Sequence, residues 1–150
     1  MLADVLRRLR ADPEPHPTQL SPEDSRLALT ALMVRLARQD EHYSAAERAM
    51  IERVLGGRYG LDPAGAAALR VEAEALEADA SDTVRFTRLI KGAVPYEERT
   101  GVIEALWRVA VADGIKAEEH GFLRLVASLI GVEDVDSGLA RQRVLRELEG

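Results

Sequence analysis

The sequence predicts an all-α protein, a bundle of seven or eight helices. Alanine, leucine, arginine and glutamate, which all favour helix, dominate the 150 residues. Aromatic residues make up only 4% of the chain, and apolar residues never alternate with polar ones over more than a few positions, as they would in a half-buried strand. Residues that begin and end helices recur along the whole chain, so each helix can be placed in turn.

The first part of the chain is expected to be separate from the main domain. Residues 1–11 predict a short amphipathic helix, because one stripe is apolar and consists of Leu2, Val5, Leu6 and Leu9. Residues 12–22 contain four of the six prolines and predict a linker. Residues 23–150 should form one helical domain, since a chain of this length buries enough surface to need no metal or disulfide.

The second predicted helix begins at Ser21 and Pro22 and runs to about Asp40. Serine suits the N-cap, and proline suits the first helical position. Apolar residues follow at the spacing of one buried face, namely Leu29, Leu32, Met33, Leu36 and Ala37.

The third predicted helix begins with a capping box. The Ser44 hydroxyl should accept a hydrogen bond from the Glu47 amide, and the Glu47 carboxylate should accept one from the Ser44 amide. We expect this helix to stop at Gly56–Gly57, because glycine often ends helices. Similar signals predict five more helices, from Asp62–Pro63 to about Asp79, from about Asp82 to Lys91, from Pro95 to near Asp113, from Ala117–Glu119 to Gly131, and from near Asp136 to the C-terminus.

The second and third predicted helices have a counterpart later in the chain. A shift of 73 residues places Arg35 on Arg108 and Asp40 on Asp113. After a deletion of one residue in the second copy, Glu47 falls on Glu119, with apolar residues aligned beyond it. The repeat predicts two pseudo-symmetric helical hairpins, each followed by a further helix.

The repeat places an aspartate at the end of one helix and a glutamate at the start of the next. An aspartate there faces the negative end of the helix dipole, so it needs compensation. The aspartates could accept hydrogen bonds from amides of the following loop. Alternatively, the paired carboxylates could be ligands of a divalent cation; this hypothesis assigns a metal site to Asp40, Glu47, Asp113 and Glu119, with Glu41 and Glu118 as further oxygen donors.

Two histidines, His42 and His120, lie in the same two loops. With the carboxylates they suggest a mixed site for a transition metal, but the spacings typical of zinc ligands are missing. Exposed loop histidines are the simpler interpretation.

Composition and motifs exclude several classes of function. The chain has no cysteine, so thiol chemistry and thiolate metal sites are excluded. Its 26 acidic residues outnumber 20 basic ones, which argues against nucleic acid as a partner. No apolar run is long enough to cross a bilayer, and no nucleophile, phosphate-binding or dinucleotide-binding motif is present. We therefore expect no catalytic residues and no bound organic cofactor.

The second copy of the repeat resembles the TerB-like tellurite-resistance family. The family's A-D-G motif and the glutamate that follows it are matched by Ala112, Asp113, Gly114 and Glu119. The first copy keeps Asp40 and Glu47 but has Glu41 in place of the glycine. The resemblance extends from about Leu20 to Leu145 and is closest to small stand-alone bacterial members.

The resemblance implies a helical bundle of seven or eight helices, the fold that the residues themselves predict. It implies a metal-binding role for the acidic residues at the motif positions. It also suggests a distant kinship with the N-terminal domain of DnaJ-like co-chaperones.

These observations favour a non-enzymatic, cytoplasmic interaction module. Its expected partner is a protein, its expected link is to stress or tellurite resistance, and its expected cofactor is a divalent cation. The first alternative is a metal-binding or metal-sensing protein that uses the paired acidic loops. The second is an enzyme in which two of the carboxylates act as acid and base in a concave pocket.

Overall fold

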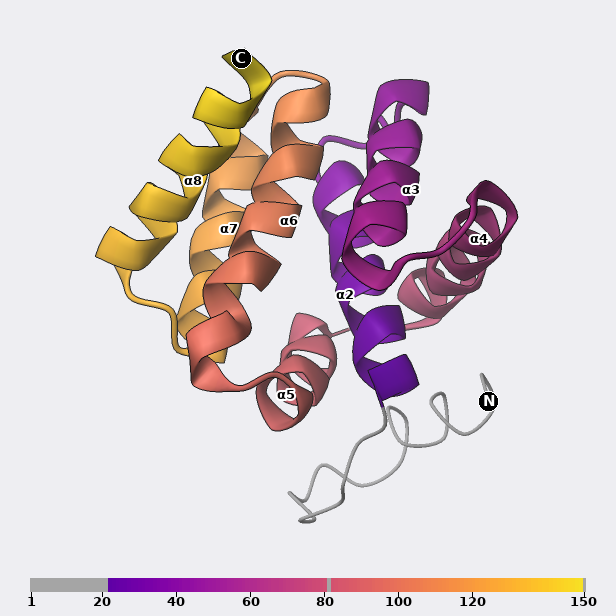
Figure 1. Cartoon of the computed structure of the whole chain (residues 1–150), viewed down its shortest axis with the longest axis horizontal. Helices are drawn as coiled ribbons and strands as arrows, with labels where there is room; N and C mark the ends of the chain where they lie inside the picture. Colours follow the sequence, from indigo (N-terminus) through magenta and orange to yellow (C-terminus); the bar gives the residue numbers. More distant parts are fainter. Residues whose placement is uncertain (1–21, 81, 150) are drawn as a thin grey trace.

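Seven α-helices and one 3₁₀ turn make up the part of the chain that the structure describes (Figure 1). The structure is a computed structural model, and it describes residues 22–80 and 82–149. The predicted helix 1–11, and almost all of the predicted linker 12–22, lie outside these residues. The elements are α2 (Pro22–Ala37), α3 (Ala45–Tyr59), α4 (Pro63–Asp79), α5 (Thr83–Ala93), η1 (Tyr96–Glu98), α6 (Arg99–Ala112), α7 (Ala117–Ile130) and α8 (Asp134–Glu149).

The all-α prediction is confirmed, since the described residues contain helices and turns and no strand. Among these residues, no helix is both long enough and apolar enough to cross a membrane. Two helical hairpins, α2–α3 and α6–α7, pack against each other, since α6 contacts both α2 and α3. Helix α4 packs on α2 and α3, α5 packs on α2 and α7, and α8 packs on α6 and α7.

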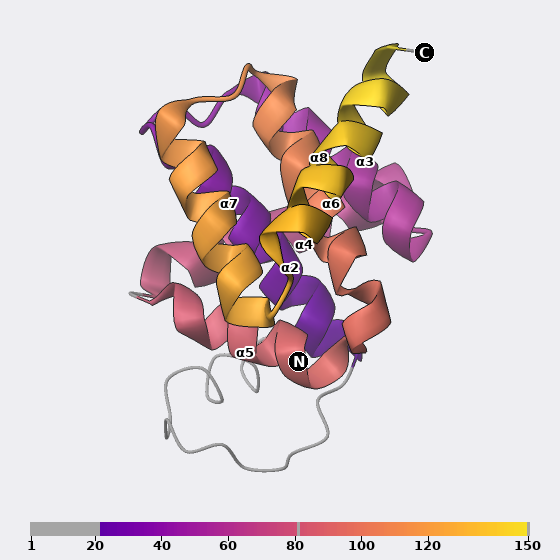
Figure 2. The same ribbon diagram turned by 90° about the vertical axis from the view of Figure 1, so that its left-hand side faces the viewer.

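Helix α2 lies at the centre of the molecule (Figures 1 and 2). All residues from Leu27 to Val34, as well as Leu36 and Ala37, are buried. The prediction of a single buried face was therefore too narrow. Helices α3, α4, α5, α6 and α7 all contact α2, and a helix covered on every side must be apolar on every side.

Arg35 lies between buried residues of this central helix and is charged. Its Nε atom donates to Glu77 Oε2 at 2.9 Å, and its Nη1 atom donates to Thr83 Oγ1 at 3.1 Å. The corresponding residue of the second hairpin, Arg108, donates to both carboxylate oxygens of Glu147 at 2.8 and 3.0 Å. Each arginine thus ties its hairpin to a glutamate on the helix that follows, α4 or α8.

Most helix starts agree with the sequence. Asp62 Oδ1 accepts from the Gly65 amide at 2.7 Å and caps α4, and Asp82 Oδ1 accepts from the Val84 amide and caps α5. Two predicted starts are shifted. Helix α8 begins at Asp134 instead of Asp136, and the turn η1 separates Pro95 from α6.

Two predicted helix ends are wrong. Helix α2 ends at Ala37, so Asp40 lies in the loop beyond it. Helix α3 passes through Gly56 and Gly57 and ends at Tyr59. Its C-cap is Gly60, which has φ of 66° and donates its amide to Gly56 O at 2.9 Å. A glycine ends a helix only where the backbone becomes left-handed, and that happens at Gly60.

The corrected end of α3 predicts opposite effects for two alanine substitutions. Gly60→Ala should lower the free energy of unfolding by about 1–2 kcal/mol, because a side chain is strained at positive φ. Gly57→Ala should raise it by about 0.5–1 kcal/mol, since Gly57 is helical and a Cβ there meets no atom within 4 Å. Urea denaturation of both variants measures this difference. A destabilising Gly57→Ala would mean that the helix ends where the sequence first suggested.

Candidate functional site

The loops of the two hairpins meet at one end of the bundle. Residues 38–44 join α2 to α3, and residues 113–116 join α6 to α7. The two views show these loops side by side, at the end opposite α5 (Figures 1 and 2). Lys116 connects them, because its Nζ lies 3.1 Å from Asp40 Oδ2 and 3.6 Å from Asp113 Oδ2.

The two aspartates are held by different contacts. Asp40 Oδ1 accepts a hydrogen bond from the His42 amide at 3.0 Å, which is the loop interaction that the first interpretation predicted. The hydrogen bond with Lys116 is the main reason that the pKa of Asp40 is lowered. Asp113 forms the C-cap of α6, and both its carboxylate and its carbonyl oxygen face the Lys116 ammonium.

Glu47 is buried at the start of α3. Its Oε1 atom accepts from the Ser44 amide at 2.8 Å, while the Ser44 hydroxyl accepts from the Glu47 amide at 3.1 Å. The predicted capping box is therefore confirmed. The side chain is 0% exposed, yet Oε2 has no hydrogen-bond partner.

Glu119 has the same environment at the start of α7. Its Oε1 atom accepts from the Lys116 amide at 3.0 Å, and its Oε2 atom is buried without a partner. The residue is 0% exposed. Each hairpin thus contributes one buried carboxylate that uses one oxygen to begin a helix and leaves the other unpaired.

Burial raises the pKa of Glu119 to about 7. The amide and the charge of Lys116 lower this pKa, whereas the negative charges of Glu47 and Asp40 raise it further. The carboxylates of one hairpin therefore lie within electrostatic reach of the other. We define the hairpin junction as the region formed by Lys116 and by the four acidic residues predicted from the repeat, Asp40, Glu47, Asp113 and Glu119.

The hairpin junction does not form a ready-made metal site. Within residues 22–80 and 82–149, no three histidine or acidic side chains are arranged to hold a metal ion. His42 is exposed and contributes its amide to Asp40, and His120 is exposed with its ring 5.7 Å from that of Trp107. Even so, two unpaired buried oxygens and two further carboxylates are a donor set that fits a hard divalent cation.

The residue after each aspartate has a left-handed backbone. Glu41 has φ of 62° and Gly114 has φ of 79°. Both loops therefore reverse direction in the same way, although only the second has the glycine that this conformation favours. Glu41 and Glu118, proposed as further oxygen donors, are both exposed.

Sequence reasoning missed Lys116. It comes three residues after Asp113 and three before Glu119, so the sequence does show a positive charge within the acidic loop. Its contact with Asp40 crosses between hairpins and has no signal in local spacing.

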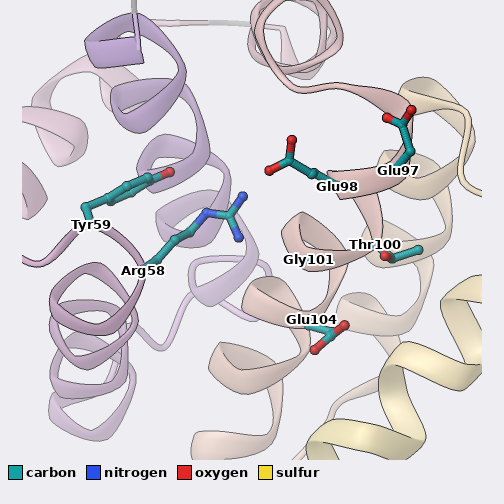
Figure 3. A pocket seen from close by; sticks show the side chains of 7 residues that line it. All are labelled: Arg58, Tyr59, Glu97, Glu98, Thr100, Gly101 and Glu104. Carbon is teal, nitrogen blue, oxygen red and sulfur yellow. The ribbon is translucent and has the colours of Figure 1, made fainter.

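Two cavities lie away from the hairpin junction. The first is lined by residues of α3, η1 and α6, including Arg58, Glu98 and Glu104 (Figure 3). The second lies beside it, between α3, α6 and α8. Neither is lined by any of the four predicted site residues.

The fold and the junction define a class of protein, an all-helical bundle whose two hairpins bring acidic side chains together at one end. The family model described as Tellurite resistance protein TerB matches residues 26–142, more than half of the chain, so the chain belongs to this family. Comparisons with curated proteins and with solved structures gave no match.

The raised pKa of Glu119 predicts a pH dependence of stability. Because this pKa lies above the ordinary value of 4.5, the folded protein binds the proton more tightly than the unfolded chain. The free energy of unfolding should therefore fall as the pH rises from 4.5 to about 7, and the loss should level off above that range.

Glu119→Gln should remove this part of the pH dependence, since the amide oxygen can still accept from Lys116. Urea denaturation of both proteins from about pH 5 to about pH 8 measures the difference. Glu118→Gln, an exposed neighbour in the same turn, is the matched control and should behave like wild type. Parallel curves for wild type and Glu119→Gln would contradict the assignment.

Proposed function

We propose that this TerB-family chain is a non-enzymatic helical module that binds a divalent cation at the hairpin junction and presents its outer surface to a protein partner. The observation that carries the proposal is the pair of buried, unpaired oxygens, Glu47 Oε2 and Glu119 Oε2. Location in the cytoplasm and a role in tellurite or other stress resistance belong to the same proposal, and family membership supports the latter.

Burying a carboxylate without a full set of partners is costly. An unsatisfied buried polar atom costs roughly 1–3 kcal/mol, and more if it is charged. Here two such atoms occur in two hairpins, close enough for the charge of Glu47 to raise the pKa of Glu119. A cation that binds both would supply the missing partners and neutralise their repulsion.

The donor set indicates the class of cation. Carboxylate oxygens suit Mg²⁺, Ca²⁺ and Mn²⁺, whereas sites of softer metals use imidazole or thiolate. Asp40, Glu47, Asp113 and Glu119 would hold the ion, with water filling the remaining positions. The ion would supply positive charge and would join the α2–α3 loop to the α6–α7 loop.

Such a link would couple the cation to the surface that a partner meets. Glu119 lies in the first turn of α7, and α7 packs against α8. These two helices carry the exposed apolar side chains Leu125, Val135 and Leu139. Exposed apolar groups on neighbouring helices support a role in protein binding.

An enzyme is the second candidate, and one observation favours it. A carboxyl group with a pKa of about 7, as at Glu119, is suited to acid–base catalysis at neutral pH. Neither of the two cavities is lined by Glu119. A cation-binding module therefore agrees better than an enzyme with the position of this carboxyl group.

Titration with Ca²⁺, Mg²⁺ and Mn²⁺ tests the proposal. We expect saturable heat in calorimetry and a matching change in the fluorescence of Trp107, the only tryptophan. Trp107 reports on the junction because its ring contacts that of His120, the residue next to Glu119. Glu47→Gln and Glu119→Gln should each weaken binding at least about tenfold, while the capping hydrogen bonds remain possible.

Glu118→Gln serves as the control, because it removes one charge from the same turn without removing a buried oxygen. Absence of heat and of a fluorescence change at millimolar cation would refute the proposed cation site. Equal weakening by Glu118→Gln would mean that an exposed carboxylate of the same turn contributes as much to binding as the buried oxygens, which would contradict the assignment to Glu47 and Glu119.

A further inference from the structure

Lys116 contributes an ammonium group to the hairpin junction. Its ammonium lies 3.1 Å from Asp40 Oδ2, 3.6 Å from Asp113 Oδ2 and 3.4 Å from the Asp113 carbonyl oxygen. An ammonium group has three donors and no acceptor. These three contacts of the Lys116 ammonium are all with oxygens of the two acidic loops.

The ammonium pairs with only half of the acidic set. It lies with the aspartates, and its ion pairs do not include Glu47 or Glu119. The Oε2 atoms of these two glutamates stay without a hydrogen-bond partner. The single positive charge of Lys116 thus offsets one of the two negative charges of the aspartates and leaves the buried glutamate oxygens without a partner.

The ammonium of Lys116 lies against the two aspartate carboxylates that belong to the proposed cation site. An ion that binds Asp40 and Asp113 together with the glutamates must approach the oxygens that the ammonium now faces. Two cations in contact with the same carboxylates repel each other strongly. The Lys116 side chain is 31% exposed, so its ammonium can turn into water.

We propose that Lys116 is an internal competitor for the cation, whose ammonium occupies the aspartate side of the junction and is displaced when a divalent ion binds. This inference rests on the proposed function. Lys116 then sets the affinity for the cation, because the ion pair between Lys116 and Asp40 must break before a cation binds. Displacement also breaks the direct contact between the two loops and replaces it with the ion.

Lys116→Met tests the competition. The variant keeps much of the side-chain volume and removes the ammonium, so Ca²⁺ or Mg²⁺ should bind at least about tenfold more tightly than in wild type. Lys91→Met is the matched control, since Lys91 is the only other lysine of the chain and is exposed on α5; its affinity should stay at the wild-type value. Lys116→Gln provides a second variant if Lys116→Met does not fold.

Chemical labelling of the wild-type protein tests the displacement itself. The rate at which acetic anhydride modifies Lys116, followed by mass spectrometry, should rise when the cation is added, because the released ammonium no longer pairs with Asp40. Lys91 is the internal reference, and its rate should not change.

The possible outcomes are distinct. If neither wild type nor Lys116→Met binds a cation at millimolar concentration, the proposed function fails and this inference fails with it. If both bind with equal affinity, the proposed function stands and the competition is wrong. Tighter binding with unchanged labelling of Lys116 would mean that its charge acts only from a distance, which overturns displacement.

Discussion

Each hairpin begins its second helix with a glutamate whose side chain turns back to accept a hydrogen bond from the backbone of the preceding loop. Glu47 accepts from the Ser44 amide, and Glu119 accepts from the Lys116 amide. This bond stabilises the loop and the helix start, but it also draws the carboxylate out of water. Because both loops lie at the same end of the bundle, the same local interaction brings two buried negative groups together.

The other residues of the junction partly offset the negative charge of these glutamates. The charge of Glu47 contributes to the raised pKa of Glu119, and Lys116 offsets part of it. Asp40 and Asp113 hold the ammonium between the loops. Farther along the hairpins, Arg35 and Arg108 fix α4 and α8 through Glu77 and Glu147. Polar contacts therefore connect the hairpins to their neighbours, while the centre of the bundle is apolar.

The sequence predicted the fold where local signals decide the structure. Asp62 and Ser44 cap helices as expected, because capping depends on residues three positions apart. The prediction that α3 ends at Gly56–Gly57 failed, because composition does not show which glycine adopts a left-handed backbone. In the structure that glycine is Gly60. The sequence-based prediction also understated the burial of α2, because the expectation of one buried face passed over the almost continuous apolar run of residues 27–34, which five surrounding helices cover. The four acidic residues of the junction were predicted because the repeat aligns them, whereas Lys116 was missed because its partner Asp40 belongs to the other hairpin.

The central claim is that the buried carboxylates of Glu47 and Glu119 act on each other across the two hairpins. A double-mutant cycle with Glu47→Gln and Glu119→Gln measures this interaction through the free energy of unfolding, in chelator at about pH 8, above the pKa of Glu119. Either single substitution removes the whole repulsion, so the double variant should gain less stability than the two single variants together, by about 0.5–3 kcal/mol. Additivity to within about 0.5 kcal/mol would show that the two glutamates are independent and would contradict the account.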